Sequence, residues 1–186
     1  MEEKHNKLSK FLSLVLRHKP EEIGLALDSQ GYLSVDELIE GINNAGKVID
    51  KRILDEILSS DNKQRYSYDS TGTKIRANQG HSIEVNLGLQ KETPPKILYH
   101  GTPEKFVRAI EKEGLIKKNR TYVHLSKDLE TARNVGSRRG EPVIFEIDTE
   151  AMIEDDYEFY VSDNGVWLTE RVPVQYLSKM KGWRIE

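Results

Sequence analysis

The stretch Ile75-Arg76-Ala77-Asn78-Gln79-Gly80-His81-Ser82 lies where the chain changes from a helical half to a half of mixed α and β character. It gathers a guanidinium, two carboxamides, an imidazole and a hydroxyl around one glycine. Arginine is a fork of donors suited to phosphate, and glycine lets the backbone approach a ligand closely. The alternative is a polar strand end followed by a turn, and the octapeptide alone leaves both interpretations open.

The N-terminal part of the chain predicts a helix, a short strand and a second helix. Apolar residues recur at helical spacing over residues 6–18, and Pro20 ends that helix. Gly24–Leu27, followed by the turn residues Asp28–Gly31, indicates a short strand and a turn. Ser34 with Glu37 makes a capping box that opens the second helix.

A third helix and a β-hairpin complete this half. Asp50 caps the helix, whose inward apolar residues extend to Leu58. Two β-like runs, 65–68 and 74–77, are joined by turn residues 69–72. Three helices followed by a hairpin is the element order of a winged helix, a module that contacts nucleic acid in some proteins and protein in others.

After the stretch, residues 87–96 have the composition of a linker, and the pattern beyond them becomes mixed α and β. The expected elements are strands at 97–99, 122–126, 143–147, 158–161 and 166–168, and helices around 106–110 and 129–135. The run 143–147 is apolar throughout and is expected to be the central strand, whereas the last two strands form a terminal hairpin. The two halves are therefore different kinds of domain, at residues 1–88 and 96–186.

Composition restricts the kinds of protein. The 186 residues are 37% hydrophobic and 32% charged, which suits a soluble globular protein of one large or two small domains. With no cysteine, disulfides, thiolate metal sites and Cys nucleophiles are excluded. No apolar run resembles a signal core or spans a bilayer, so we expect a cytoplasmic protein without a membrane partner. A net charge of -3 argues against broad coating of nucleic acid but allows a local basic pocket.

Familiar catalytic motifs are missing. The five histidines lack metal-ligand spacing, so no metal is expected. The phosphate loop Gly-x-x-x-x-Gly-Lys-Ser/Thr, the dinucleotide fingerprint Gly-x-Gly-x-x-Gly and the nucleophile elbow Gly-x-Ser-x-Gly are all absent.

What remains is a set of basic residues at the ends of predicted elements: Arg17, His18, Arg65, Arg76, His81, Arg138 and Arg139. Guanidiniums converging with an imidazole suit a phosphate dianion. The alternative is that each is a solvated surface cation, with Arg17 and His18 complementing a helix dipole. In the second half, His100-Gly101-Thr102 and His124-Leu125-Ser126 end strands, where they either frame a ligand crevice or hold buried, hydrogen-bonded histidines.

Eight motifs in the same order along nearly the whole chain resemble the RNA 2′-phosphotransferases, the tRNA-splicing phosphotransferase family. They are Leu16–Pro20, Asp28–Gly31, Lys63–Tyr66, Ile75–Ser82, Tyr99–Thr102, Val123–Ser126, Val135–Gly140 and Asn164–Val166. The chain departs from the family pattern at Tyr66, where the family often has Phe, and the aromatic ring is kept.

The resemblance implies an α+β protein with an N-terminal winged-helix lobe, a C-terminal lobe similar to ADP-ribosyltransferases, and an active site in the cleft between them. It also implies NAD as a consumed co-substrate. The internal 2′-phosphate of an RNA (tRNA-like) attacks the nicotinamide ribose and expels nicotinamide. The ribose 2″-hydroxyl then attacks phosphorus, which releases RNA with a 2′-hydroxyl and ADP-ribose 1″,2″-cyclic phosphate.

The same resemblance assigns roles to residues. The family's essential Arg-His-Arg-Arg set corresponds to Arg17, His18, Arg65 and Arg138, with the arginines on the phosphate and the histidine acting in the second step. NAD is assigned to His100, Gly101, Thr102, His124, Leu125, Ser126, Gly165 and Val166. Substrate phosphate and RNA are assigned to Lys63, Arg76, Gln79, His81, Ser82 and Arg139. An apolar residue near Gly165-Val166 replaces the glutamate of protein-modifying relatives, because a phosphate dianion needs no base to become a nucleophile.

Two other functions stay open from the sequence. One is an ADP-ribosyltransferase that modifies terminal phosphates of nucleic acid and stops after the first step. The other is a winged-helix nucleic-acid binder without catalysis, although a binder has no need of Arg17, His18, Arg65 and Arg138 across both halves. We expect a monomer, because no segment indicates an obligate interface.

Overall fold

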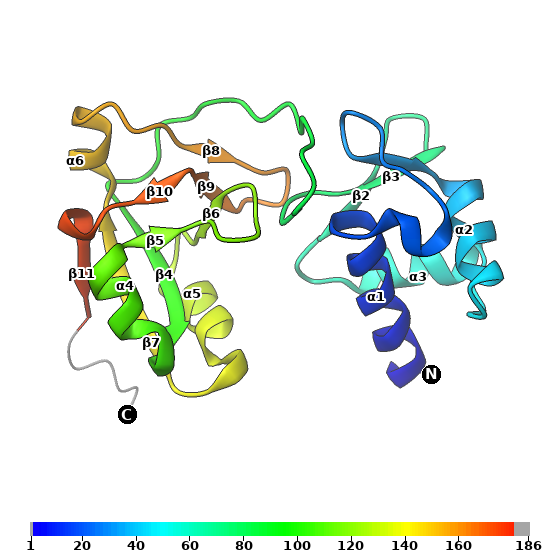
Figure 1. Ribbon diagram of the computed structural model, residues 1–186, viewed down its shortest axis with the longest axis horizontal. Helices are drawn as coiled ribbons and strands as arrows, with labels where there is room; N and C mark the ends of the chain where they lie inside the picture. The colour runs from blue at the N-terminus through cyan, green and yellow to red at the C-terminus, as the bar shows by residue number, and fades with distance from the viewer. Residues whose placement is uncertain (1, 181–186) are drawn as a thin grey trace. The chain divides into compact units, whose positions relative to one another are not determined.

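The structure is a computed structural model that describes residues 2–180, and the chain divides into two units between Gly88 and Leu89. Unit 1 is Met1–Gly88 and unit 2 is Leu89–Glu186. The described residues form six α-helices and several small sheets, so the protein is a mixed α and β protein (Figure 1).

Unit 1 contains the three predicted helices, α1 (Glu2–Arg17), α2 (Val35–Asn44) and α3 (Lys51–Ser60). The predicted caps are confirmed, since the Glu37 N–H donates to Ser34 Oγ at 3.4 Å and the Ile53 N–H donates to Asp50 Oδ1 at 2.8 Å. The first helix begins earlier than expected and ends at Arg17, so His18 lies just beyond its last turn.

The predicted hairpin is confirmed and belongs to an antiparallel sheet of three strands. Its strands β2 (Tyr66–Tyr68) and β3 (Lys74–Ala77) are joined by β1 (Tyr32–Ser34), in the order β1-β3-β2. β3 is therefore central, and the polar stretch at residues 75–82 starts inside this sheet. β1 was not among the predicted strands.

The strand predicted at Gly24–Leu27 is wrong. Residues 25–27 have no regular secondary structure, and the 3₁₀ turn η1 (Pro20–Ile23), closed by Gly24 at φ 71°, precedes them. Leu25 and Leu27 pack against the core while Ala26 is exposed, so the alternation is present without a strand. The turn at Asp28–Gly31 is confirmed, and Asp28 Oδ1 accepts the N–H groups of Gln30 and Tyr32 at 2.9 Å each.

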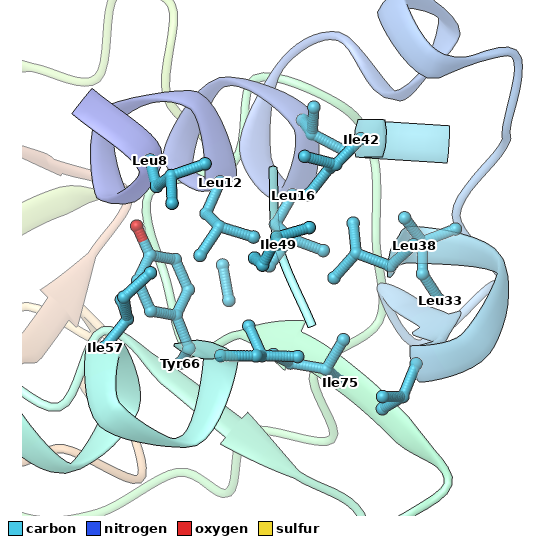
Figure 2. Packing of buried hydrophobic residues seen from close by; sticks show 14 residues of the cluster. Leu8, Leu12, Leu16, Leu33, Leu38, Ile42, Ile49, Ile57, Tyr66 and Ile75 are labelled. Carbon is cyan, nitrogen blue, oxygen red and sulfur yellow. The ribbon is translucent and has the colours of Figure 1, made fainter. Parts of the chain in front are cut away.

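The core of unit 1 lies between α1, the other two helices and the sheet (Figure 2). Leu12 and Leu16 of α1 are fully buried and meet Ile75 of β3, Ile42 of α2 and Ile57 of α3 in one cluster. This packing fixes the C-terminal end of α1 relative to β3.

Unit 2 is built on a sheet in the order β11-β7-β4, from Leu177–Lys179, Pro142–Asp148 and Ile97–Pro103. β7 is central, which confirms that prediction. A second sheet has the order β6-β9-β8, from Val123–Leu125, Trp167–Thr169 and Tyr160–Val161, and a two-stranded sheet pairs β5 (Leu115–Ile116) with β10 (Arg171–Val172). The hairpin of β8 and β9 is confirmed but is not terminal, since β10 and β11 follow it.

The helices of unit 2 are α4 (Val107–Glu113), α5 (Leu129–Gly136) and α6 (Thr149–Glu154), with short 3₁₀ turns η2 (Glu104–Phe106), η3 (Ser137–Arg139) and η4 (Val174–Tyr176). Helix α5 lies beside β4 and β7 (Figure 1). A Cβ on Gly101 of β4 would lie 1.6 Å from the carbonyl oxygen of Ala132 in α5, so only glycine allows this approach.

Two strands that carry predicted site residues meet at one point in unit 2. The backbones of Tyr99 and Ser126 exchange two N–H···O bonds of 2.8 Å, which joins β4 to the end of β6. The motifs that begin with His100 and His124 are therefore neighbours. None of the helices among residues 2–180 is long and apolar enough to cross a membrane.

Candidate functional site

The end of α1 is tied to the polar stretch that follows β3. The Ser82 N–H donates to the Arg17 carbonyl at 3.0 Å, and Ser82 Oγ lies 2.9 Å from His18 Nδ1. Gly80 has φ 87°, and a Cβ on it would lie 3.4 Å from the guanidinium carbon of Arg17. The fold thus brings together Arg17, His18 and the stretch, although 57 or more residues separate them in sequence.

Arg17 is further held on its own helix. Its Nη1 lies 3.3 Å from Ser13 Oγ, one turn earlier. The side chain is partly buried, whereas His18 is exposed. A guanidinium held in this way is preorganised for an anion, because less rotamer freedom is lost on binding.

His81 lies inside this group of cations but is itself neutral. It is 1% exposed, and burial, followed by the positive charges of Arg17, His18 and Arg76, lowers its pKa to about 4. Its Nε2 lies close to the turn before β1, where a Cβ on Gly31 would be 3.4 Å away. The burial of His81 argues against direct contact with a substrate and indicates a structural role in the wall of the site.

Arg76 and Gln79 complete what we call the arginine cluster, which is Arg17, His18, Arg76, Gln79, His81 and Ser82. The Arg76 guanidinium lies 4.7 Å from the centre of the Tyr32 ring, and its Nη1 donates to the Gln30 carbonyl at 3.3 Å. The buried Oε1 of Gln79 has no hydrogen-bond partner within residues 2–180. A buried acceptor of this kind is suited to a donor from a ligand.

Arg65 is oriented by Asp61, which the sequence interpretation left out, and by Asn78, which belongs to the polar stretch but was given no role. Asp61, whose side chain is 6% exposed, accepts from the Arg65 guanidinium and, at 2.7 Å, from the Arg65 backbone N–H. Buried Asn78 donates from its backbone to the Arg65 carbonyl at 2.8 Å, and its Nδ2 donates to the Gln64 carbonyl at 2.7 Å. Lys63, which precedes Gln64 and Arg65 in the sequence, is exposed.

In unit 2 two histidines have opposite tautomers, which follows from their partners. His100 Nδ1 lies 3.2 Å from the His124 carbonyl, which only accepts, so Nδ1 carries the proton and Nε2 is an acceptor. Arg120 Nη1 lies 3.0 Å from His124 Nδ1, and because a guanidinium only donates, the proton of His124 is on Nε2. Burial lowers the pKa of His100, which keeps its imidazole neutral.

Arg120 belongs to this site, although it was not among the predicted residues. Arg120 is exposed as a residue, but partial desolvation of its guanidinium and then the charge of Arg138 lower its pKa, so the two guanidiniums influence each other. Arg138 and Arg139 are exposed in η3. We call His100, His124, Arg120 and Arg138 the histidine cluster. Arg120 stands just before a strand, so the criterion of basic residues at element ends would have found it.

Several predicted cofactor residues have packing roles. Gly101 makes room for α5, Leu125 is buried in the core of unit 2, and Thr102 is 3% exposed. Gly165 has φ 79° in the turn between β8 and β9, where the Val166 N–H donates to Ser162 Oγ at 3.1 Å. These residues shape the strand ends rather than offer polar side chains, Thr102 excepted.

No group of three or more His, Cys, Asp or Glu side chains within residues 2–180 is arranged to hold a metal ion. The polar groups of the two clusters are guanidiniums, imidazoles, a carboxamide and a hydroxyl. This donor set is suited to an anionic ligand with hydroxyl groups.

In this mixed α and β protein, a preorganised guanidinium and an imidazole lie together at the end of a helix. These groups are suited to binding a phosphorylated ligand. Residues 3–171 match the family described as RNA 2′-phosphotransferase, Tpt1 / KptA family. A protein of Fusobacterium nucleatum named Probable RNA 2′-phosphotransferase is 54% identical over 172 residues, covering 92% of this chain and 96% of its own. Proteins with the same name from Trichormus variabilis and Flavobacterium johnsoniae are 54% and 52% identical, over 94% and 91% of this chain and 96% and 93% of their own. The chain belongs to the RNA 2′-phosphotransferase family.

Proposed function

We propose that this protein is an NAD-dependent RNA 2′-phosphotransferase. It removes an internal 2′-phosphate from RNA through an ADP-ribosylated phosphate, and the products are RNA with a 2′-hydroxyl, nicotinamide and ADP-ribose 1″,2″-cyclic phosphate. Membership of the family supports this proposal. The observation that supports it most directly is the attachment of Arg17 and His18 to the polar stretch at Gly80–Ser82. A guanidinium suited to a phosphate and an imidazole able to donate a proton therefore lie on consecutive residues.

We also propose that unit 1 is a winged-helix lobe and that unit 2 is an ADP-ribosyltransferase-like lobe. Three helices followed by a β-hairpin support the first assignment. The second is supported by the neighbouring His100 and His124 motifs at the joined ends of β4 and β6.

Several groups of unit 2 support the proposal of NAD as co-substrate. His100 offers an acceptor at Nε2 and His124 a donor at Nε2, which match ribose hydroxyls, while Arg120 and Arg138 suit a pyrophosphate. When bound, NAD supplies the anomeric carbon that the RNA phosphate attacks and the ribose hydroxyl that takes the phosphate from the RNA. Ser126, Gly165 and Val166 lie at the adjoining strand ends and are proposed to line the same place.

The guanidiniums of unit 1 hold the RNA phosphate in this proposal. Arg17 and Arg65 neutralise its two charges, and their fixed orientation costs little reorganisation when charge develops at phosphorus. His18 donates a proton to the leaving RNA oxygen in the second step. Lys63 and Arg76 contact the RNA backbone nearby.

The fourth guanidinium of the catalytic set is assigned to unit 2. Arg138 was the sequence-based choice, and both Arg138 and Arg120 are exposed. Arg120 is hydrogen-bonded to His124 and is the better-oriented of the two. We therefore propose that Arg120, with Arg138 and Arg139, contacts both the pyrophosphate of NAD and the 2′-phosphate of the RNA, and we expect the loss of Arg120 to reduce activity most.

The test incubates the full chain with NAD and an RNA that carries one internal 2′-phosphate, and mass spectrometry resolves the products. Release of nicotinamide together with ADP-ribose cyclic phosphate and 2′-hydroxyl RNA is the expected result. An RNA with a 5′-phosphate and no 2′-phosphate is the matched control. Stable ADP-ribosylated RNA would favour the terminal-phosphate transferase instead, and unchanged NAD with every RNA would refute both enzymatic functions.

A further inference from the structure

Ser82 is attached to the end of α1 by two bonds of different kinds. Its backbone N–H donates to the Arg17 carbonyl at 3.0 Å, which fixes the position of its Cα. Its hydroxyl oxygen lies 2.9 Å from His18 Nδ1. Backbone and side chain of one residue therefore hold two consecutive residues of another segment.

The bond to Ser82 contributes to the orientation of the His18 ring. His18 lies just beyond the last residue of α1 and is exposed, so neither helix geometry nor core packing fixes its ring. Imidazole has two ring nitrogens, and the bond made by one of them determines which atom the other presents. A hydrogen bond at Nδ1 turns Nε2 away from Ser82.

From this geometry we propose that Ser82 is a positioning residue for His18. It holds Nδ1, so that Nε2 is the atom that exchanges a proton with the substrate. The sequence interpretation gave Ser82 to direct contact with phosphate or RNA, and this inference replaces that role. The catalytic part of it depends on the proposed function, whereas the control of the imidazole ring does not.

The proton balance is consistent with this role. In the second step the attacking ribose oxygen bonds to phosphorus while the bond from phosphorus to the RNA 2′-oxygen breaks. The RNA oxygen takes the proton from His18 Nε2, and the attacking hydroxyl releases its proton to water. The Ser82 hydroxyl accepts from Nδ1–H both before and after this transfer, so the ring keeps its orientation while its charge changes.

The first measurement is made on the ring itself. Nitrogen-15 correlation spectra of the full chain report which His18 nitrogen is protonated, in wild type and in Ser82→Ala, without NAD or RNA. We expect the His18 ring signals to shift toward a mixture of the two tautomers in Ser82→Ala, and to stay near wild type in Ser82→Thr. Unchanged His18 signals in Ser82→Ala would overturn the inference, whatever reaction the protein catalyses.

The second measurement separates positioning from contact with RNA. With 2′-phosphorylated RNA, Ser82→Ala should slow the second step by roughly 10- to 100-fold, so that ADP-ribosylated RNA accumulates, while nicotinamide release and KM for RNA change little. Ser82→Thr should restore most of the rate, and Ser70→Ala, an exposed serine in the hairpin turn, is the control. A raised KM for RNA at an unchanged second step would instead show direct contact and refute positioning. If the wild type does not act on this RNA, the proposed function fails and the spectra alone decide the role of Ser82.

Discussion

Replacing Asn78 by alanine tests whether the buried carboxamide holds the segment that carries Arg65. The side chain makes two hydrogen bonds, from Nδ2 to the Gln64 carbonyl at 2.7 Å and from Ser67 Oγ to Oδ1 at 2.6 Å. Each such bond contributes about 1 kcal/mol net, and stranding a part-buried partner costs about 1 kcal/mol more. Asn78→Ala should therefore lower the free energy of unfolding by roughly 2–4 kcal/mol.

The same change should affect activity more than stability alone explains. Gln64 has φ 44°, a conformation that its carbonyl bond to Asn78 helps to maintain directly before Arg65. Without that bond the Arg65 guanidinium is less well oriented. At a temperature where the variant is fully folded, we expect turnover of 2′-phosphorylated RNA to fall by about tenfold or more.

Urea unfolding followed by far-ultraviolet circular dichroism measures the stability change, because α1, α2 and α3 supply most of the α-helix. Ser67→Ala removes only one of the two bonds and should cost about 1 kcal/mol. Asn44→Ala changes an exposed asparagine in α2 and should stay within about 0.5 kcal/mol of wild type. A loss for Asn78→Ala no larger than that for Ser67→Ala would refute the reasoning.

Three further predictions concern the packing of unit 2, pH dependence and the arginines. Gly101→Ala should prevent unit 2 from folding, measured by Trp167 fluorescence, because the added Cβ would meet the Ala132 carbonyl oxygen at 1.6 Å. The free energy of unfolding should fall by up to about 3 kcal/mol as pH is lowered from 6.5 to about 4. The reason is that the unfolded chain protonates His81 in this range and the folded chain does not. This stabilising contribution of neutral His81 is fully present above pH 6.5. Arg120→Ala should reduce nicotinamide release at least tenfold more than Arg138→Ala, measured as initial rates with saturating RNA.

Each of these three predictions has a matched control. Gly46→Ala adds a Cβ in open space at φ 82° and should cost only about 1 kcal/mol, so an equal effect at Gly101 would contradict the packing argument. His81→Gln should flatten the pH dependence of unit 1, and an unchanged slope would assign the effect to other groups. Arg133→Ala, in α5, controls for loss of positive charge, and equal losses at Arg120 and Arg138 would contradict the preference for Arg120.

Local chemistry made much of the secondary structure predictable. Ser34 and Asp50 accept from backbone N–H groups three residues later, so these caps depend on neighbours in sequence. The prediction failed at Gly24–Leu27, where alternating burial is not accompanied by a partner strand. It missed β1, whose three residues form a strand because β3 pairs with them. Pairing partners are distant in sequence, and short strands carry little signal of their own.

For the site, the sequence by itself determined which chemical groups are present: arginines and histidines at element ends, and the polar stretch from Ile75 to Ser82. Tertiary structure alone decided how they are used. It buried His81, joined Ser82 to His18, and placed Asp61 and Asn78 around Arg65. The physical reason is that burial, tautomer and orientation depend on atoms many residues away, which are brought close only when helices and strands pack on a common core.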